Sequence, residues 1–147
     1  MTIAGYKAPR REVPLQGAES FSVKGLTLED ISVLIETHFN DLDGLIELFT
    51  SQSVDLTMDN IKPIATAIVG QAPGFAANLI ALAAGEPDAA PTIQKEFGAG
   101  VQIKAVMEIG DLTFSEAGGI KKGLESVVAL LANNRKVLTK AVKKKAG

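Results

Sequence analysis

Apolar and polar residues alternate near the start of the chain, and this alternation predicts a β-hairpin over residues 10–25. Two runs, Arg11–Leu15 and Ser20–Lys24, flank a four-residue turn at Gln16–Glu19. The alternating apolar residues are Val13 and Leu15 on one side, and Phe21 and Val23 on the other. Pro14 cannot donate a ladder hydrogen bond, so its strand should lie at an edge or the pairing should break there. Residues 1–9 are expected to be a flexible arm.

From residue 26 onward the apolar residues recur at intervals of three and four, which predicts helices. Thr27 is a suitable N-cap, with Asp30 three residues later in a weak capping-box pattern. The expected helices are 28–39, 41–51, 58–69, 73–84, a short one from Pro91, one over 101–109 that could also be a short strand, and a last one opening at Ser115 or Glu116. The prediction is therefore one mainly α domain over residues 1–147. It has an N-terminal β-hairpin, a compact bundle of about five to seven short helices within a body at 26–142, and a basic tail at 143–147.

Residues 63–85 carry no charged side chain, so they form a membrane span, a buried core or a surface for another chain. At 1.5 Å per residue this stretch reaches about 34 Å as one helix, enough for a hydrocarbon core of about 30 Å. However, Pro73 inside a helix would cost about 3 kcal/mol. Small and polar residues also dilute the apolar ones. The sequence favours two short helices that meet at Gly70–Pro73.

Charge is segregated along the chain although the net charge is only −2. Eight acids and no Lys or Arg lie between Lys24 and Lys62, whereas six basic residues and no acid follow Asn133. Complementary regions of this kind can guide head-to-tail association. The candidate self-association residues are Asp41, Asp43, Glu47, Lys143, Lys144 and Lys145. The alternative is that both regions are solvated helix faces, since lysines are favoured near a helix C-terminus.

No pattern in the sequence indicates catalysis, a metal site or a cofactor. The chain has no cysteine, and His38 is its only histidine, so thiol chemistry and multi-histidine metal sites are absent. The acidic segments that start at Asp41 and Asp55 fail the spacing of a calcium loop. The glycines around Gly123 fail the spacing of a phosphate-binding loop. The lysine tail has no interleaved aromatic residue for stacking on bases, so a solvated helix end is favoured over a nucleic-acid site. The expected partners include neither a nucleic acid nor a membrane.

The N-terminal third resembles the tail assembly chaperones of long-tailed bacteriophages, also called pre-tape-measure proteins. The similarity lies in the runs Arg10-Arg11-Glu12-Val13-Pro14-Leu15 and Ser20-Phe21-Ser22-Val23-Lys24-Gly25-Leu26-Thr27-Leu28-Glu29-Asp30-Ile31, and it covers about the first fifty residues. It implies a non-catalytic protein that binds the tape measure protein, keeps it soluble and helps recruit tail tube subunits. It also implies a homo-oligomer that acts in the host cytoplasm and is absent from the mature virion.

Many such chaperones exist in two forms, the longer made by ribosomal frameshifting. Consecutive lysines at 143–145 can be encoded by an adenine run on which ribosomes slip, so we expect this chain to be the short form. A longer form would be the one that contacts the tail tube protein. Two other functions remain open from the sequence, a structural virion protein of the tail or head–tail connector and a small membrane-active protein.

A chaperone for a helical apolar client needs grooves of small and aliphatic side chains. The candidate client-binding residues are Ile64, Ile68, Phe75, Leu79, Ile80 and Leu82. The alternative is that these residues form the core of the domain.

Overall fold

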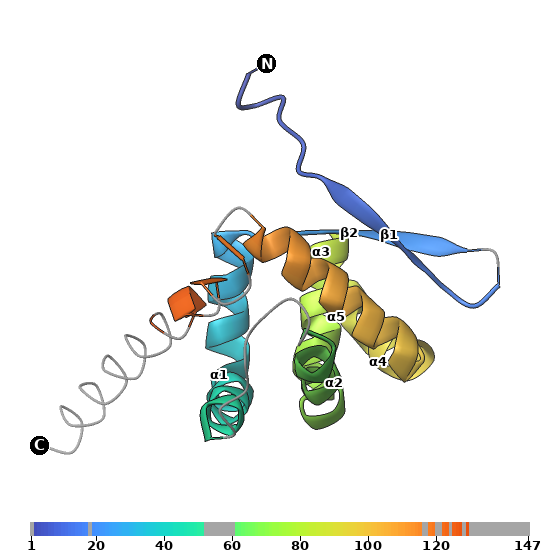
Figure 1. Cartoon of the computed structure of the whole chain (residues 1–147). Coiled ribbons are helices and arrows are strands. Elements are labelled where there is room, and N and C mark those ends of the chain that lie inside the picture. Colours follow the sequence, from blue (N-terminus) through green and yellow to red (C-terminus); the bar gives the residue numbers. More distant parts are fainter. Residues whose placement is uncertain are drawn as a thin grey trace, which may run out of the picture.

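The computed structural model describes residues 2–17, 19–51, 61–115, 118–119, 122–123, 125–127 and 129. In these residues a two-stranded hairpin precedes the helices, as predicted (Figure 1). The elements are β1 (Arg10–Pro14), β2 (Ser20–Lys24), α1 (Leu28–Ser51), α2 (Ile61–Gln71), α3 (Pro73–Ala84), the 3-10 helix η2 (Pro87–Ala89), α4 (Ala90–Glu96) and α5 (Ala99–Phe114). The mainly α fold class is confirmed. The predicted last helix, with the basic tail, lies largely outside the described residues.

The hairpin lies along α5. Its strands pair antiparallel, with Val13 opposite Phe21 and Arg11 opposite Val23. Val13 and Val23 are completely buried, because this face of the hairpin packs against α5 and, through β2, against α3. At the edge of this same face, Arg11 Nη1 donates to Glu108 Oε2 of α5 at 2.8 Å and also pairs with Asp111. The hydrogen bond to Glu108, followed by the one to Asp111, raises the pKa of Arg11.

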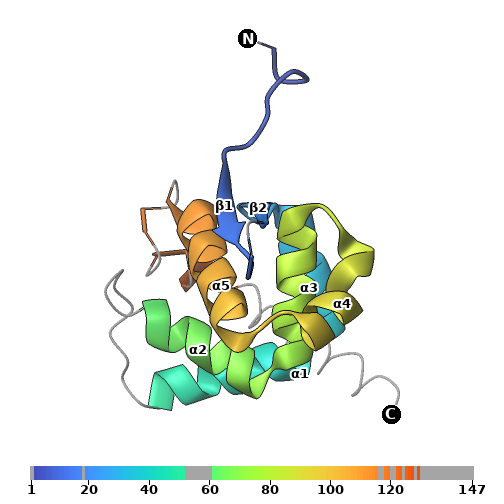
Figure 2. The same ribbon diagram turned by 90° about the vertical axis from the view of Figure 1, so that its right-hand side faces the viewer.

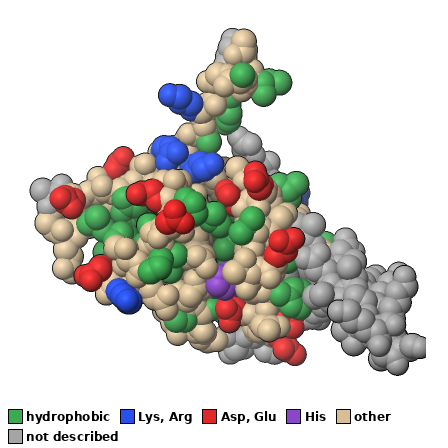
Figure 3. All heavy atoms as spheres, turned by 180° about the vertical axis from the view of Figure 1, so that it is seen from behind, with side chains coloured by type: hydrophobic (Ala, Val, Ile, Leu, Met, Phe, Trp, Pro, Cys, Tyr) green, Lys and Arg blue, Asp and Glu red, His purple; other side chains and the backbone are tan. Residues whose placement is uncertain are grey.

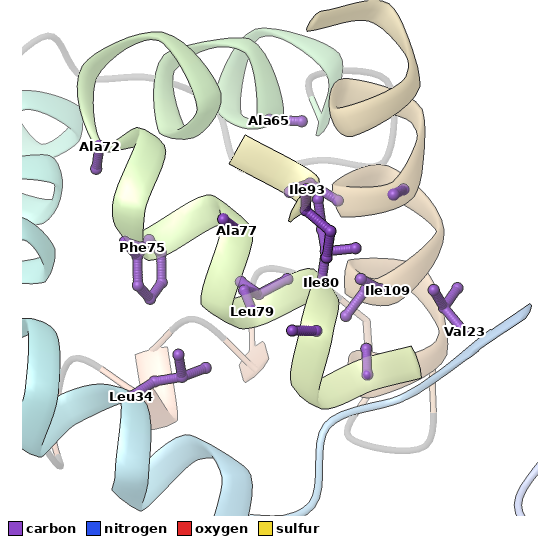
Figure 4. Packing of buried hydrophobic residues seen from close by; sticks show 14 of the residues in the cluster. Val23, Leu34, Ala65, Ala72, Phe75, Ala77, Leu79, Ile80, Ile93 and Ile109 are labelled. Atoms are coloured by element: carbon purple, nitrogen blue, oxygen red, sulfur yellow. The ribbon is translucent and has the colours of Figure 1, made fainter. Parts of the chain in front are cut away.

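The helix α3 is the centre of the core (Figure 4). It packs against α1, α2, α4, α5, β2 and η2. Seven of its twelve residues are buried. They are Phe75, Ala76, Ala77, Leu79, Ile80, Ala81 and Ala83. The small side chains allow neighbouring helices to approach closely, and the absence of charge means that none has to be desolvated.

The predicted break in the uncharged stretch is confirmed. The helix α2 ends at Gln71 and α3 begins at Pro73, with a bend of 115° between them. Proline is tolerated in the first turn of a helix because its missing N–H would have no partner there. The helix α3 ends at Ala84 and is capped by Gly85, whose φ of 78° is left-handed and favours glycine.

The two helices predicted at 28–39 and 41–51 are both present within the span of α1, where they meet at a kink close to the predicted boundary. The prediction reflects a real irregularity, since His38 has non-helical φ and ψ of −125° and 33° and kinks the helix. At its start, Thr27 Oγ1 accepts from the Asp30 N–H at 3.1 Å, and Asp30 Oδ2 accepts from the Thr27 N–H at 3.0 Å. This reciprocal pair is the predicted capping box.

Other boundaries differ from the prediction by a few residues. The helix expected at 101–109 extends over Ala99–Phe114, with Gly98 as its N-cap and Gly100 inside its first turn. The short helix expected from Pro91 begins at Ala90 and follows η2 directly. The expected start of α2 at Met58 lies outside the described residues, and its end is two residues later than predicted.

Candidate partner-binding surface

The six predicted client-binding residues are divided between the interior and the surface. Four of them, Ile64, Phe75, Leu79 and Ile80, are buried in this single chain. For these four the structure shows the alternative left open by the sequence, a place in the core of the domain. The other two, Ile68 and Leu82, are half-buried and pack against the edge of that core. Client binding by this set remains a prediction, and only the last two offer apolar area to a partner without movement of the core.

An open groove lies between α3 and the segment formed by η2 and α4. Its lining residues are Gly74, Asn78, Pro87, Asp88, Ala90, Pro91, Gln94 and Lys95. Gly74 and Asn78 are one helical turn apart on α3, and Leu82 follows one turn later on the same face. The groove therefore has glycine at one end, an amide in the middle and one of the predicted client-binding residues in line with it.

A polar joint fixes the kink of α1 to α3. Asn78 Nδ2 lies 2.6 Å from His38 Nε2, and His38 Nδ1 lies 3.4 Å from Asp41 Oδ2. If the amide donates to Nε2, then Nδ1 carries the proton and donates to the carboxylate. The imidazole also lies edge-on to Phe75, with ring centroids 5.7 Å apart. Because α3 is the main packing partner of α1 among the described elements, this joint positions α1 on the body.

The predicted self-association residues are only partly placed by the structure. Asp41 and Glu47 are exposed on α1, and Asp43 is half-buried on the same helix. Lys143, Lys144 and Lys145 lie outside the described residues. The acidic side of the prediction therefore has a surface position, while its basic side remains a sequence-based expectation.

Sequence reasoning missed a second group of surface residues, the exposed apolar side chains outside the uncharged stretch. Ile3 and Tyr6 project from the N-terminal arm, and Leu28 and Val33 lie on the outer face of α1. The signal was present in the sequence. This holds for Val33, which lies about 160° around the helix from the buried Ile35. Leu28 lies at nearly the same angle as Ile35, seven positions later, and is exposed at the start of the helix, which periodicity does not predict. Figure 3 shows hydrophobic side chains interspersed with acidic ones on one face of the molecule.

Within the described part of the chain, no group of three His, Cys, Asp or Glu side chains is close enough to hold a metal ion. No single helix there is long and apolar enough to cross a bilayer. The pair α2 and α3 together has the length and composition of a span but is sharply bent where the two helices meet, and α3 is mostly buried in the core.

Comparison with known proteins gives a match along the whole sequence. The family model described as "Pre-tape measure protein" matches residues 1–147, well beyond the fifty N-terminal residues that carry the resemblance. Neither the curated proteins nor the solved structures contain a match. Since the family model spans the full length, the chain belongs to the pre-tape measure protein family, whose members take part in the assembly of phage tails.

Proposed function

We propose that this chain is a non-catalytic tail assembly chaperone. It binds the tape measure protein of its phage, keeps that long protein soluble and helps recruit tail tube subunits around it. It acts in the cytoplasm of the bacterial host and is absent from the finished virion. The observation that carries the proposal is membership of the pre-tape measure family over residues 1–147.

The surface between α3 and α4 supports this role because it has the chemistry that an amphipathic helix requires. A helix that docks in a groove inserts apolar side chains spaced three and four residues apart. The groove offers proline and alanine carbon from η2 and α4, together with the amides of Asn78 and Gln94. Leu82 extends this apolar line along α3. The client segment best suited to it is therefore an amphipathic helix with one narrow apolar stripe.

The buried members of the predicted set support this binding indirectly. Phe75, Leu79 and Ile80 are buried around α3 and belong to the core that holds this helix against α4. A rigid groove loses less conformational entropy on binding than a mobile one. In this proposal the core residues shape the docking face, and Leu82 and Ile68 contact the client.

Co-expression tests the proposal directly. The tape measure protein is produced with and without this chain, and its fraction in the soluble extract is measured by quantitative immunoblotting. We expect the client to precipitate alone and to stay soluble with the chaperone. A client that is equally soluble alone, or that precipitates in both cases, would contradict the chaperone function. Detection of this chain at stoichiometric levels in purified virions would indicate a structural virion protein instead.

A pair of arginine variants on α4 tests the docking groove. Gln94→Arg places a charged side chain at the groove, whereas Thr92→Arg places the same side chain on an exposed position of α4 that does not line it. We expect Gln94→Arg to weaken client binding about tenfold, equivalent to about 1.4 kcal/mol, and Thr92→Arg to leave it unchanged. Equal binding by both variants would remove the groove from the proposal and leave the family role intact.

The proposed self-association and the proposed frameshifted form of the chain have separate tests. Charge reversal at Lys143–Lys145 should reduce the oligomer mass if these residues pair with the acids of α1 in another copy.

Mass spectrometry of the protein made from the native gene should detect a longer product that shares this sequence. An absence of that product would remove the frameshift expectation, which is the basis for a contact with the tail tube protein.

A further inference from the structure

The largest exposed apolar side chains of the described residues form two pairs. Ile3 and Tyr6, in the arm, are 97% and 54% exposed, and Leu28 and Val33, on α1, are 69% and 44% exposed. Single exposed apolar residues are ordinary on a protein surface. Here the two pairs lie on segments of opposite local charge, as the two sides of one contact would require.

The arm holds its two apolar side chains together. The Tyr6 N–H donates to Ile3 O at 3.1 Å, and the Gly5 N–H donates to Thr2 O at 3.2 Å. A turn of this kind keeps the Cα atoms of its first and fourth residues within about 7 Å. Ile3 and Tyr6 occupy these two positions and form a small apolar unit. In Figures 1 and 2 the arm projects away from the helices, so it does not lie on its own body.

The charge of the arm is entirely positive. Lys7 and Arg10 follow the apolar turn, and no acid precedes Glu12. Figure 3 shows basic side chains along the arm and at its base, while the body below carries scattered acidic side chains and a further basic one. The partner of this arm should therefore combine a small apolar area with negative charge.

The outer face of α1 has these two properties. Leu28 and Val33 are separated by about 7.5 Å along the helix axis and by about 140° around it, so they border the exposed half of α1 on its two sides. At 100° per residue, Glu29 and Glu36 lie on the helix surface between these two apolar residues, and both are exposed. The interval from 25 to 61 contains no Lys or Arg to oppose a basic segment.

We propose that the arm of one chain docks on the outer face of α1 in a second copy. Ile3 and Tyr6 cover Leu28 and Val33, while Lys7 and Arg10 lie beside Glu29 and Glu36. The contact joins two different surfaces, so each chain keeps a free arm at one end and a free α1 face at the other. An interface of this type closes into a ring or grows as an open helical array.

An array of this kind suits a protein that covers a long client. The inference deepens the proposed function by naming the surfaces of self-association, and it rests on that function for its biological meaning. The contact itself does not require the client. Its test therefore uses the purified full-length chain alone and is separate from the client-solubility test.

Two single variants and their mixture test the contact. Ile3→Asp disables the arm, and Leu28→Glu disables the α1 face while adding an acid to the first helical turn, where acids are favoured. Light scattering after size-exclusion chromatography measures the mass. We expect the unmodified chain to form species larger than 15.4 kDa and each variant alone to be a monomer. An equimolar mixture should form a dimer, because each chain retains the surface that the other lacks.

A charge swap with matched controls supplies a second measurement. Lys7→Glu and Glu36→Lys should each weaken association by at least tenfold, and the double variant should recover most of that loss. The control substitutions Lys62→Glu and Glu96→Lys, at exposed positions on α2 and α4, should leave association unchanged.

Several outcomes would overturn the inference. The unmodified chain could remain a monomer, the arm and α1 variants could keep its mass, or the mixture could fail to pair. A loss of association that occurs only on charge reversal of Lys143–Lys145 would assign the α1 acids to the C-terminal segment instead.

Discussion

The helices α3 and α1 have opposite relations to the rest of the molecule. Six other elements surround α3, which carries no charge and buries seven of its twelve residues. In contrast, α1 is twice as long, carries six acids and no Lys or Arg, and packs mainly against α3. The domain therefore places most of the buried apolar residues of its core in the uncharged helix and a long exposed acidic surface in the other.

The two helices also differ in how each is held. Small side chains along α3 allow six other elements to contact it, so its position is fixed mainly by packing. The position of α1 is fixed by hydrogen bonds near its start and at its kink, besides the packing of its buried residues. Leu26 N donates to Thr113 Oγ1 at 2.9 Å just before the helix starts, and His38 meets Asn78 at the kink. A helix held at a few points can expose the rest of its surface.

Truncation of one side chain in each helix should give the largest contrast. Ile80 is 0% exposed at the centre of the core, so Ile80→Ala should lower the free energy of unfolding by about 2–5 kcal/mol through lost burial and a new cavity. Val33→Ala, on the outer face of α1, should change it by less than about 0.5 kcal/mol. Urea unfolding followed by circular dichroism at low protein concentration measures both. Equal losses would show that α1 is as deeply integrated as α3.

Two glycine substitutions should have opposite signs. A Cβ on Gly25 would lie 2.9 Å from Leu112 O and 3.1 Å from Thr113 N, both backbone atoms of α5. Gly25→Ala should therefore cost about 1–3 kcal/mol, because the entry to α1 must move away from α5. A Cβ on Gly44, inside α1, meets nothing within 4 Å, so Gly44→Ala should stabilise by about 0.5–1 kcal/mol.

Thermal unfolding of the two alanine variants against the unmodified chain measures this pair. A destabilising Gly44→Ala would indicate that the outer side of α1 is covered by something other than solvent. A neutral Gly25→Ala would show that the anchoring of α1 on α5 is loose.

Much of this organisation is visible in the sequence because it depends on local rules. The capping box at Thr27, the hairpin alternation around Val13 and the helix break at Pro73 each follow from a few neighbouring residues. Local signals of this type act over one or two helical turns. They gave the fold class and the arrangement of α2 and α3.

The surface of α3 could not be predicted, because a helix without charged residues has no polar side to mark what faces outward. Leu79 and Leu82 look equivalent in the sequence, yet one is buried and the other is half-exposed. Only the positions of α1 and α4 around the helix decide between them. The burial of Gln102 on α5 could not be predicted either, because it depends on a distant partner. Its Nε2 donates to Phe97 O, just after the end of α4, at 2.9 Å.

The joint between α1 and α3 gives the smallest and most local prediction. Asn78→Ala removes the partner of His38 Nε2 and leaves a half-buried ring nitrogen without its protein hydrogen bond. The loss should be about 1 kcal/mol, since a neutral hydrogen bond contributes about 0.5–1.5 kcal/mol. Hydrogen exchange should show faster exchange of the α1 amides on both sides of the kink, with α3 protected as before. Asn40→Ala, exposed on α1, is the matched control and should alter neither quantity. If Asn78→Ala instead increases exchange in α3 and α5, the joint supports the core, and α1 is not a separately held helix.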